Sequence, residues 1–95
     1  MKISHLDHLV LTVADIETTC QFYQSALNFE VITFGENRKA LRFGTQKINL
    51  HQVGKEFEPK ALHPTAGSAD LCFIAETPID EVMAHLHVQN ISIVE

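Results

Sequence analysis

One pattern constrains the fold more than any other: a strand, a helix and a strand recur in the same order after a shift of 62 positions. Residues 6–13 and 69–75 alternate apolar and polar side chains, which predicts two half-buried strands. Each is followed by apolar residues at helical spacing, over 16–27 and 79–86. The shift needs no gap and sets His8 on Asp70. The sequence therefore predicts an internal duplication.

The ends of the two predicted helices follow the same shift. Asp15 and Thr77 stand at the position of an N-terminal cap, and Pro78 follows Thr77 as the expected first helical residue. Asn28 and Asn90 follow the two helices at equivalent places. Few residues are identical between the copies, so the repeat is one of pattern.

The first copy continues beyond the repeated part. Residues 29–34, 39–43 and 47–53 predict three further strands, whereas 54–67 contains two prolines and no period, as expected of a surface linker. We therefore expect an α+β fold of paired βαβββ modules, with module one at 1–53, the linker at 54–67 and module two at 68–95. Module two is expected to be truncated to βαβ, because the counterpart of His51 would lie past residue 95.

Composition excludes several classes of function. The 95 residues carry a net charge of −5 with no basic run, which argues against a nucleic-acid partner. No stretch approaches the roughly 20 apolar residues that span a membrane, and the first residues do not resemble a signal peptide. We expect a cytoplasmic protein in which Cys20 and Cys72 are buried free thiols.

Three polar residues stand out on the predicted strands, namely His8, His51 and Asp70. Imidazole nitrogen and carboxylate oxygen are common ligands of divalent metals. Taken singly, each His would be a hydrogen-bonded strand residue and Asp70 an exposed one. A pseudo-twofold axis between the copies would instead bring His8 and Asp70 together as candidate ligands. We expect Arg42 and Asn49, which are within reach of a ligand, to have surface roles.

Several motifs resemble one superfamily. Residues 6–13, the pair Phe22 and Tyr23, and residues 47–51 resemble the vicinal oxygen chelate superfamily, which includes glyoxalase I, the fosfomycin- and bleomycin-resistance proteins and extradiol dioxygenases. Residues 38–44, 54–61 and 63–64 resemble the subgroup called glyoxalase domain-containing protein 5. The resemblance spans nearly the whole chain.

The resemblance implies a cupped sheet around a divalent metal. By position, His8 and His51 would be the first- and last-strand ligands of module one, and Asp70 the first-strand ligand of module two. The metal (Zn, Ni, Mn or Fe) stays open, and Asp70 stands where many relatives have His. The fourth ligand of the family, a carboxylate that also serves as base, belongs to a strand past residue 95, so no catalytic residue is assigned.

Two classes of function therefore stay open. The first is a glyoxalase-like, metal-dependent lyase, isomerase or ligand-modifying enzyme that acts on a small substrate with adjacent oxygens. The second is a non-catalytic small-molecule-binding or interaction module, or a fragment that lacks the fourth ligand. In either case, an unpaired sheet edge favours association. We expect a homodimer in which two chains complete each other's cup.

Overall fold

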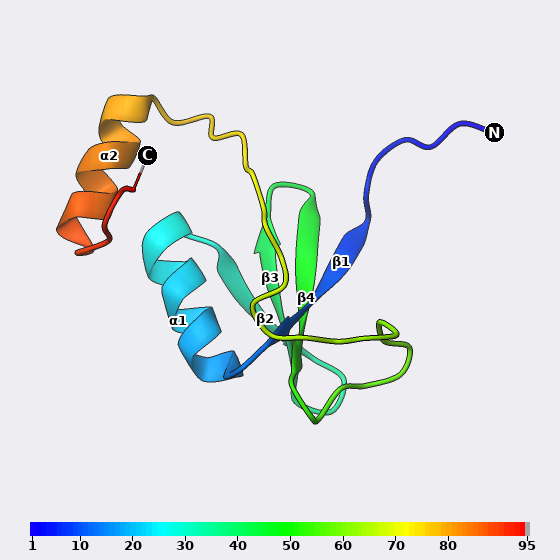
Figure 1. Ribbon diagram of the computed structural model, residues 1–95. Helices are drawn as coiled ribbons and strands as arrows, with labels where there is room; N and C mark the ends of the chain where they lie inside the picture. The colour runs from blue at the N-terminus through cyan, green and yellow to red at the C-terminus, as the bar shows by residue number, and fades with distance from the viewer. Residues whose placement is uncertain (95) are drawn as a thin grey trace.

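The computed structural model describes residues 1–94 as one four-stranded sheet flanked by two helices (Figure 1). The elements follow in the order β1 (His8–Val13), α1 (Ile16–Leu27), β2 (Glu30–Phe34), β3 (Arg38–Phe43), β4 (Gln46–Gln52) and α2 (Ile79–Val88). The predicted bounds of the first module agree with these to within two residues.

The sheet has the strand order β1-β4-β3-β2. β1 runs parallel to β4, whereas the other two pairs are antiparallel. Two tight turns join β2 to β3 and β3 to β4, and α1 carries the chain from one edge strand to the other. The predicted α+β class and the βαβββ order of the first module are thereby confirmed.

The two faces of this sheet differ in chemistry. On the helix side, α1 covers a core that includes Leu41, Ile48 and Leu50, each at most 2% exposed. We call the other side the polar face. It carries His8, Val10 and Thr12 from β1, Glu30, Ile32 and Phe34 from β2, Arg38, Ala40 and Arg42 from β3, and Lys47, Asn49 and His51 from β4.

The two helices have similar C-terminal ends, as the predicted repeat implies, but different N-terminal ends. Asp15 caps α1, because its Oδ1 accepts a hydrogen bond from the Thr18 amide at 3.1 Å. Asn28 and Asn90 adopt left-handed backbone conformations with φ of 57° and 59°, as is common after a helix. The predicted Thr77 cap is wrong: the N-cap of α2 is Pro78, whose carbonyl accepts the first helical hydrogen bonds.

The two predicted strands that flank α2 are not formed. Residues 69–75 and 91–94 have no strand hydrogen bonds, although α2 itself is present. Within the described chain neither segment has a neighbouring strand to pair with, and strand structure requires such a partner. Side chains position the first segment instead: the Phe73 ring lies edge-on to Phe29 and Phe43, 5.4 Å from each ring centroid.

The expected burial of two further side chains is also corrected. Cys20 is a buried free thiol as predicted, but Cys72 is exposed, and its neighbour Leu71 is the residue that packs against the core. The helical pattern also predicts Phe22 as a core residue, but Phe22 is 49% exposed, although its ring meets that of Tyr23 edge-on.

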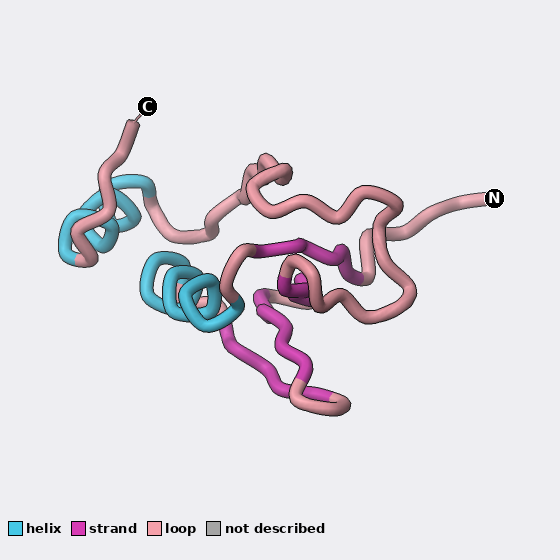
Figure 2. Tube along the Cα trace, turned by 60° about the horizontal axis from the view of Figure 1, so that its bottom comes forward, coloured by secondary structure: helices cyan, strands magenta, loops and turns pink. Residues whose placement is uncertain are grey.

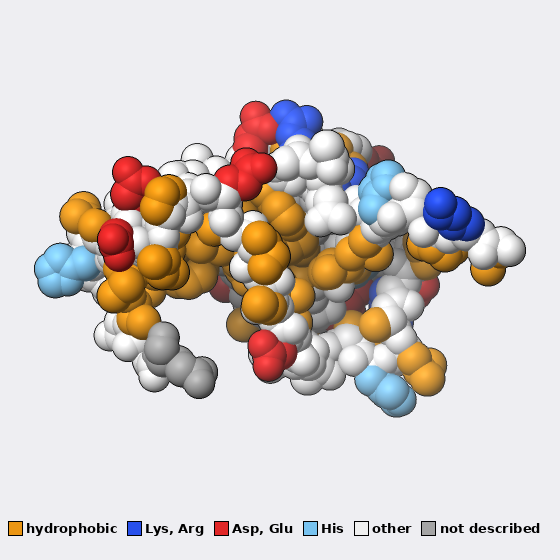
Figure 3. Space-filling model, turned by 90° about the horizontal axis from the view of Figure 1, so that it is seen from above, with side chains coloured by type: hydrophobic (Ala, Val, Ile, Leu, Met, Phe, Trp, Pro, Cys, Tyr) orange, Lys and Arg blue, Asp and Glu red, His pale blue; other side chains and the backbone are white. Residues whose placement is uncertain are grey.

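α2 lies beside α1 in both ribbon and tube views (Figures 1 and 2). His85 Nε2 lies 2.8 Å from the Ser25 carbonyl and joins the two helices. No residue of α2 is buried, and Ile79, Met83 and Val88 are exposed. The view from above shows apolar side chains gathered on this side of the molecule (Figure 3). Neither helix of residues 1–94 has the length and apolarity needed to cross a bilayer.

Candidate functional site

The polar face is organised in rows that cross the strands. Strand register sets Thr12 beside His51, and continuing the β3–β4 register by one residue sets Arg38 on the other side of His51. Phe34 is the partner of Arg38 on β2. His8 pairs with Lys47, two rows away. His8 and His51 therefore lie on the same face, as the alternation of side chains along β1 and β4 predicts. Along the strand direction they are four residues apart, which corresponds to about 13 Å.

His51 is the most buried polar residue of this face. The residue is 1% exposed, and within residues 1–94 neither Nδ1 nor Nε2 has a hydrogen-bond partner. Burial, aided by the nearby Arg38 charge, lowers the pKa of His51. The imidazole is therefore neutral at pH 7, which is the form that binds metals or accepts a proton. A buried polar group without a partner is uncommon and points to a functional role.

An aromatic and cationic layer covers His51. The Phe57 ring, carried by the segment after β4, lies 6.0 Å from the His51 ring. The Arg38 guanidinium lies 4.5 Å from the Phe57 ring centroid and 5.0 Å from that of Phe34. Lys47 Nζ lies 5.0 Å from the Phe34 centroid. This layer explains why a histidine on a face without a helix is nevertheless buried.

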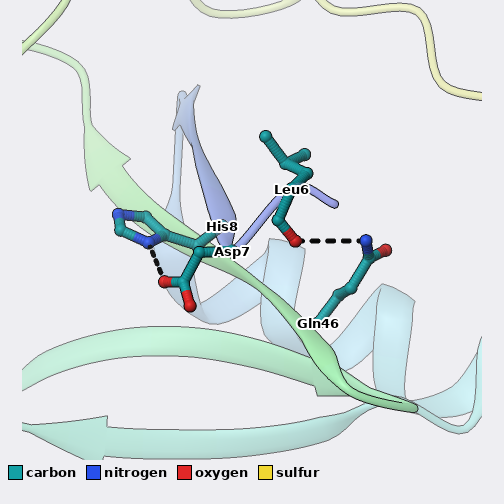
Figure 4. A network of polar contacts seen from close by, with 4 residues as sticks. All are labelled: Leu6, Asp7, His8 and Gln46. Carbon is teal, nitrogen blue, oxygen red and sulfur yellow. Dashed lines mark hydrogen bonds and ion pairs between the residues drawn. The ribbon is translucent and has the colours of Figure 1, made fainter. Parts of the chain in front are cut away.

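His8 lies at the edge of the same face and has a carboxylate partner. Its Nδ1 is 2.7 Å from Asp7 Oδ2, as the close-up shows (Figure 4). The hydrogen bond to His8 lowers the pKa of Asp7, assisted by the charges of His8 and Lys47. A carboxylate on one ring nitrogen fixes the tautomer and orients the other nitrogen toward a metal or a ligand.

Asp70 is exposed and lies on a segment that contacts the opposite side of the molecule. Its neighbours Ala69 and Leu71 line a hollow with Leu11 and Tyr23, on the helix side of the sheet. Within residues 1–94, no three His, Cys, Asp or Glu side chains form a group that could hold a metal. A single chain thus brings His8 and His51 to one face, but does not bring Asp70 to it.

Three residues of the face were missed or misplaced by sequence reasoning. Asp7 orients His8, and its only sequence signal is that it precedes the histidine. Arg38 borders His51 because of strand register, which the sequence does not reveal. Asn49 is 8% exposed and its Oδ1 has no partner, so the expected surface role is wrong for this residue. Arg42 is exposed and pairs with Glu30, as a surface residue would.

The chain is similar over its whole length to several known proteins. The chain is 61% identical over its full length to the virulence protein STM3117 of Salmonella typhimurium, of which it covers 66%. The crystal structure of that protein superposes with a TM-score of 0.96 and is covered over 75% of its chain. An integron cassette protein of V. cholerae has 59% identity and a TM-score of 0.96, with 74% of its chain covered and all of this one.

A second curated relative is the glyoxalase domain-containing protein RDO1 of Mycosarcoma maydis. It is 52% identical over all 95 residues, which cover 53% of its length. This chain thus spans less than two thirds of both curated relatives.

More distant structures share the fold alone. Lactoylglutathione lyase from Agrobacterium tumefaciens has 17% identity and a TM-score of 0.76, over 100% of this chain and 77% of that one. A mutant of the fosfomycin resistance protein FosX from Listeria monocytogenes, complexed with Mn(II), has 23% identity and a TM-score of 0.59, over 94% and 67% of the two chains. Residues 5–94 match the family model described as Glyoxalase/Bleomycin resistance protein/Dioxygenase superfamily. The chain belongs to this superfamily.

Proposed function

We propose that this chain is part of a glyoxalase-like protein that uses a divalent metal on its polar face to act as a lyase, an isomerase or a ligand-modifying enzyme. Its substrate would be a small molecule with two adjacent oxygens. The observation that carries the proposal is His51, a buried neutral imidazole with two unpartnered nitrogens on the face that also presents His8. The name of the fungal relative also agrees with the glyoxalase domain-containing subgroup.

Each proposed residue has the chemistry of a metal ligand, although one chain places His8 and His51 about 13 Å apart along the paired strands and does not bring Asp70 to them. His8 has the carboxylate partner Asp7 that typically orients a metal-binding imidazole, and His51 is held in its neutral, ligating form. Asp70 is the proposed third ligand. The FosX structure with Mn(II) supports metal use in this fold, and leaves the identity of the metal here open. A bound metal would act as a Lewis acid that stabilises negative charge on a substrate oxygen.

Asp7 and His51 have distinct proposed roles. Asp7 holds the proton of His8 at Nδ1, so that Nε2 stays available to bind. His51 stays unprotonated near neutral pH because the protein buries it next to Arg38. Burial thus keeps the His51 imidazole in the form that can bind a metal.

A non-catalytic binding module is the second candidate. Glu30 is the one carboxylate among the strand residues of the polar face, and Arg42 pairs with it. No free carboxylate on these strands can therefore serve as a general base. A protein that binds a small molecule without converting it would need none.

A second copy of the chain is the proposed partner, because it would supply what one chain does not bring together. Asp70 lies away from His8 and His51, and the apolar side chains Ile74, Ile79 and Met83 are exposed. A homodimer would cover apolar surface of this kind. Light scattering at micromolar concentration should give twice the mass of one chain; a well-folded monomer would refute the dimer.

The cytoplasm is the proposed location. Cys20 and Cys72 are both free thiols, one buried and one exposed. Cysteines stay reduced in that compartment.

Metal stoichiometry tests the proposed site. We would purify the chain without an affinity tag, load it with Zn²⁺, Mn²⁺ or Ni²⁺, remove free metal and measure what remains bound. The wild type should retain metal, whereas His51→Ala and His8→Ala should lose it. His87→Ala, on the exposed helix α2, is the matched control and should bind as the wild type does. Unchanged stoichiometry in both site variants would refute the assignment.

A further inference from the structure

The charge of the polar face is opposite to that of the whole chain. The chain has a net charge of −5, yet the strand residues of this face include the cations Arg38, Arg42 and Lys47 against the single anion Glu30. Arg42 is neutralised by its ion pair with Glu30. Two cationic side chains, Arg38 and Lys47, are left on the face.

Neither of these two cations has an ion-pair partner in residues 1–94. Three carboxylates near the face have other partners: Asp7 bonds to His8, Glu56 accepts a hydrogen bond from the Gly54 amide at 2.8 Å, and Glu58 pairs with Lys60 at 3.7 Å. The charges of Arg38 and Lys47 are therefore available to a ligand.

Aromatic rings hold both cations in place. The Arg38 guanidinium lies within 5.0 Å of the Phe34 and Phe57 ring centroids, and Lys47 Nζ approaches Phe34. A guanidinium stacked on rings keeps its in-plane N–H groups free, and these match the two oxygens of a carboxylate or a phosphate. Both cations therefore contact the same ring, that of Phe34 on the edge strand β2.

Four buried polar atoms of the same face also lack hydrogen-bond partners within residues 1–94. Arg38 Nε, Asn49 Oδ1 and both ring nitrogens of His51 are buried without a hydrogen bond. Asn49 and His51 are 8% and 1% exposed. Four such atoms on adjacent rows of one face indicate a polar site that a ligand or ordered water completes.

From this arrangement we infer that Arg38 and Lys47 form an oxyanion subsite on the polar face, which takes the carboxylate or phosphate-type group of a small ligand. Asn49 and His51 form the floor of the subsite. The inference deepens the proposed function by naming the chemical class of its ligand, an anionic small molecule. It does not depend on a bound metal, so it can be tested on metal-free protein.

Titration of the metal-free full chain with simple anions tests the subsite. Inorganic phosphate and acetate would be added at constant ionic strength, with chloride as the reference, and the amide chemical shifts of β3 and β4 recorded. At least one anion should saturate in the millimolar range. Arg38→Met and Lys47→Met should each raise its Kd about tenfold, the loss of one charge-assisted hydrogen bond.

Two matched variants separate this subsite from general charge effects. Arg42→Met removes a cation of the same face that Glu30 already neutralises, and Lys39→Met removes one whose Nζ bonds to Thr33 on the helix side. Both should change Kd by less than about twofold, because Arg42 is already paired with Glu30 and Lys39 lies on the other face of the sheet. Arg38→Lys keeps the charge but loses the planar guanidinium, and should weaken binding less than Arg38→Met.

The outcomes distinguish this inference from the metal proposal. Saturable binding that Arg38→Met and Lys47→Met weaken, in protein that binds no metal, supports the subsite while the metal proposal fails. No saturation with either anion, or equal effects of Arg42→Met and Lys47→Met, overturns the subsite whatever the metal result. The preferred anion shows whether the ligand group is of the carboxylate or the phosphate type.

Discussion

Replacing His51 by leucine should stabilise the metal-free protein. Leucine has a similar volume and no polar atoms, so it removes two buried ring nitrogens that have no hydrogen-bond partner. Each unsatisfied buried polar group costs about 1–3 kcal/mol. The lost edge contact with the Phe57 ring, 6.0 Å between centroids, offsets about 0.5–1.5 kcal/mol. We expect the free energy of unfolding to rise by at least about 0.5 kcal/mol.

Urea unfolding at pH 8, after treatment with a chelator, measures this change. A gain of about 1 kcal/mol also raises Tm by roughly 4–8 °C in a domain of this size. The adjacent Gln52→Leu is the matched control, because Gln52 Oε1 accepts a hydrogen bond from the Ile16 amide at 3.2 Å. Its loss should destabilise the protein by about 1 kcal/mol. If His51→Leu destabilises the protein as much as Gln52→Leu does, the His51 nitrogens have partners and the functional interpretation is refuted.

Three further predictions concern pH, helix ends and the core. The folded-state pKa of His51 lies below its usual 6.5, so His51 is protonated first in the unfolded state as the pH falls. The free energy of unfolding should therefore be highest above pH 6.5. Below that pH it should decline by up to about 1.4 kcal/mol per pH unit. His51→Leu should flatten this decline in urea unfolding from pH 8 to 5, and parallel profiles would contradict it. Asn28→Ala should cost about 1 kcal/mol at its positive φ, whereas Asn28→Gly should not; equal thermal stability of the two would argue against a strained position. Leu41→Ala, fully buried beneath α1, should cost about 2–5 kcal/mol, and a loss below 1 kcal/mol in denaturant unfolding would indicate a loosely packed core.

Short-range patterns predicted the first module well. Alternation on β1 and β4 correctly separated Leu9 and Leu50 from His8 and His51, because side chains of a strand point to alternate faces. The Asp15 cap depends only on the residues that follow it, and was also predicted correctly. Features of this kind depend on residues that are close together in the sequence, so sequence patterns predict them.

Long-range contacts limited the prediction of the site. The stagger between His8 and His51 depends on the register of β1 against β4, which no local pattern encodes. His51 is buried by Phe57, a residue of the segment that composition marks as a surface linker. Arg38 joins the site only because β3 lies beside β4.

The second copy illustrates a different limit. The periodicity predicted a strand over 69–75 and placed Asp70 beside His8. The helix-side packing of Leu71 and Phe73 agrees with the predicted alternation, but this segment has no pairing partner in the described chain. A strand is defined by its neighbour as much as by its own sequence. The predicted pseudo-twofold placement of Asp70 next to His8 is not seen within residues 1–94, and Asp70 stays a proposed ligand.

The side-chain nitrogens of the six histidines offer the most direct test of the proposed metal site. We would label the protein with ¹⁵N, add Zn²⁺ in steps and follow each ring by NMR. The rings of His8 and His51 should respond together and saturate at one metal per site, while His85 and His87 on α2 stay unchanged. A response confined to His5, His63, His85 or His87 would contradict the assignment of the polar face as the metal-binding face.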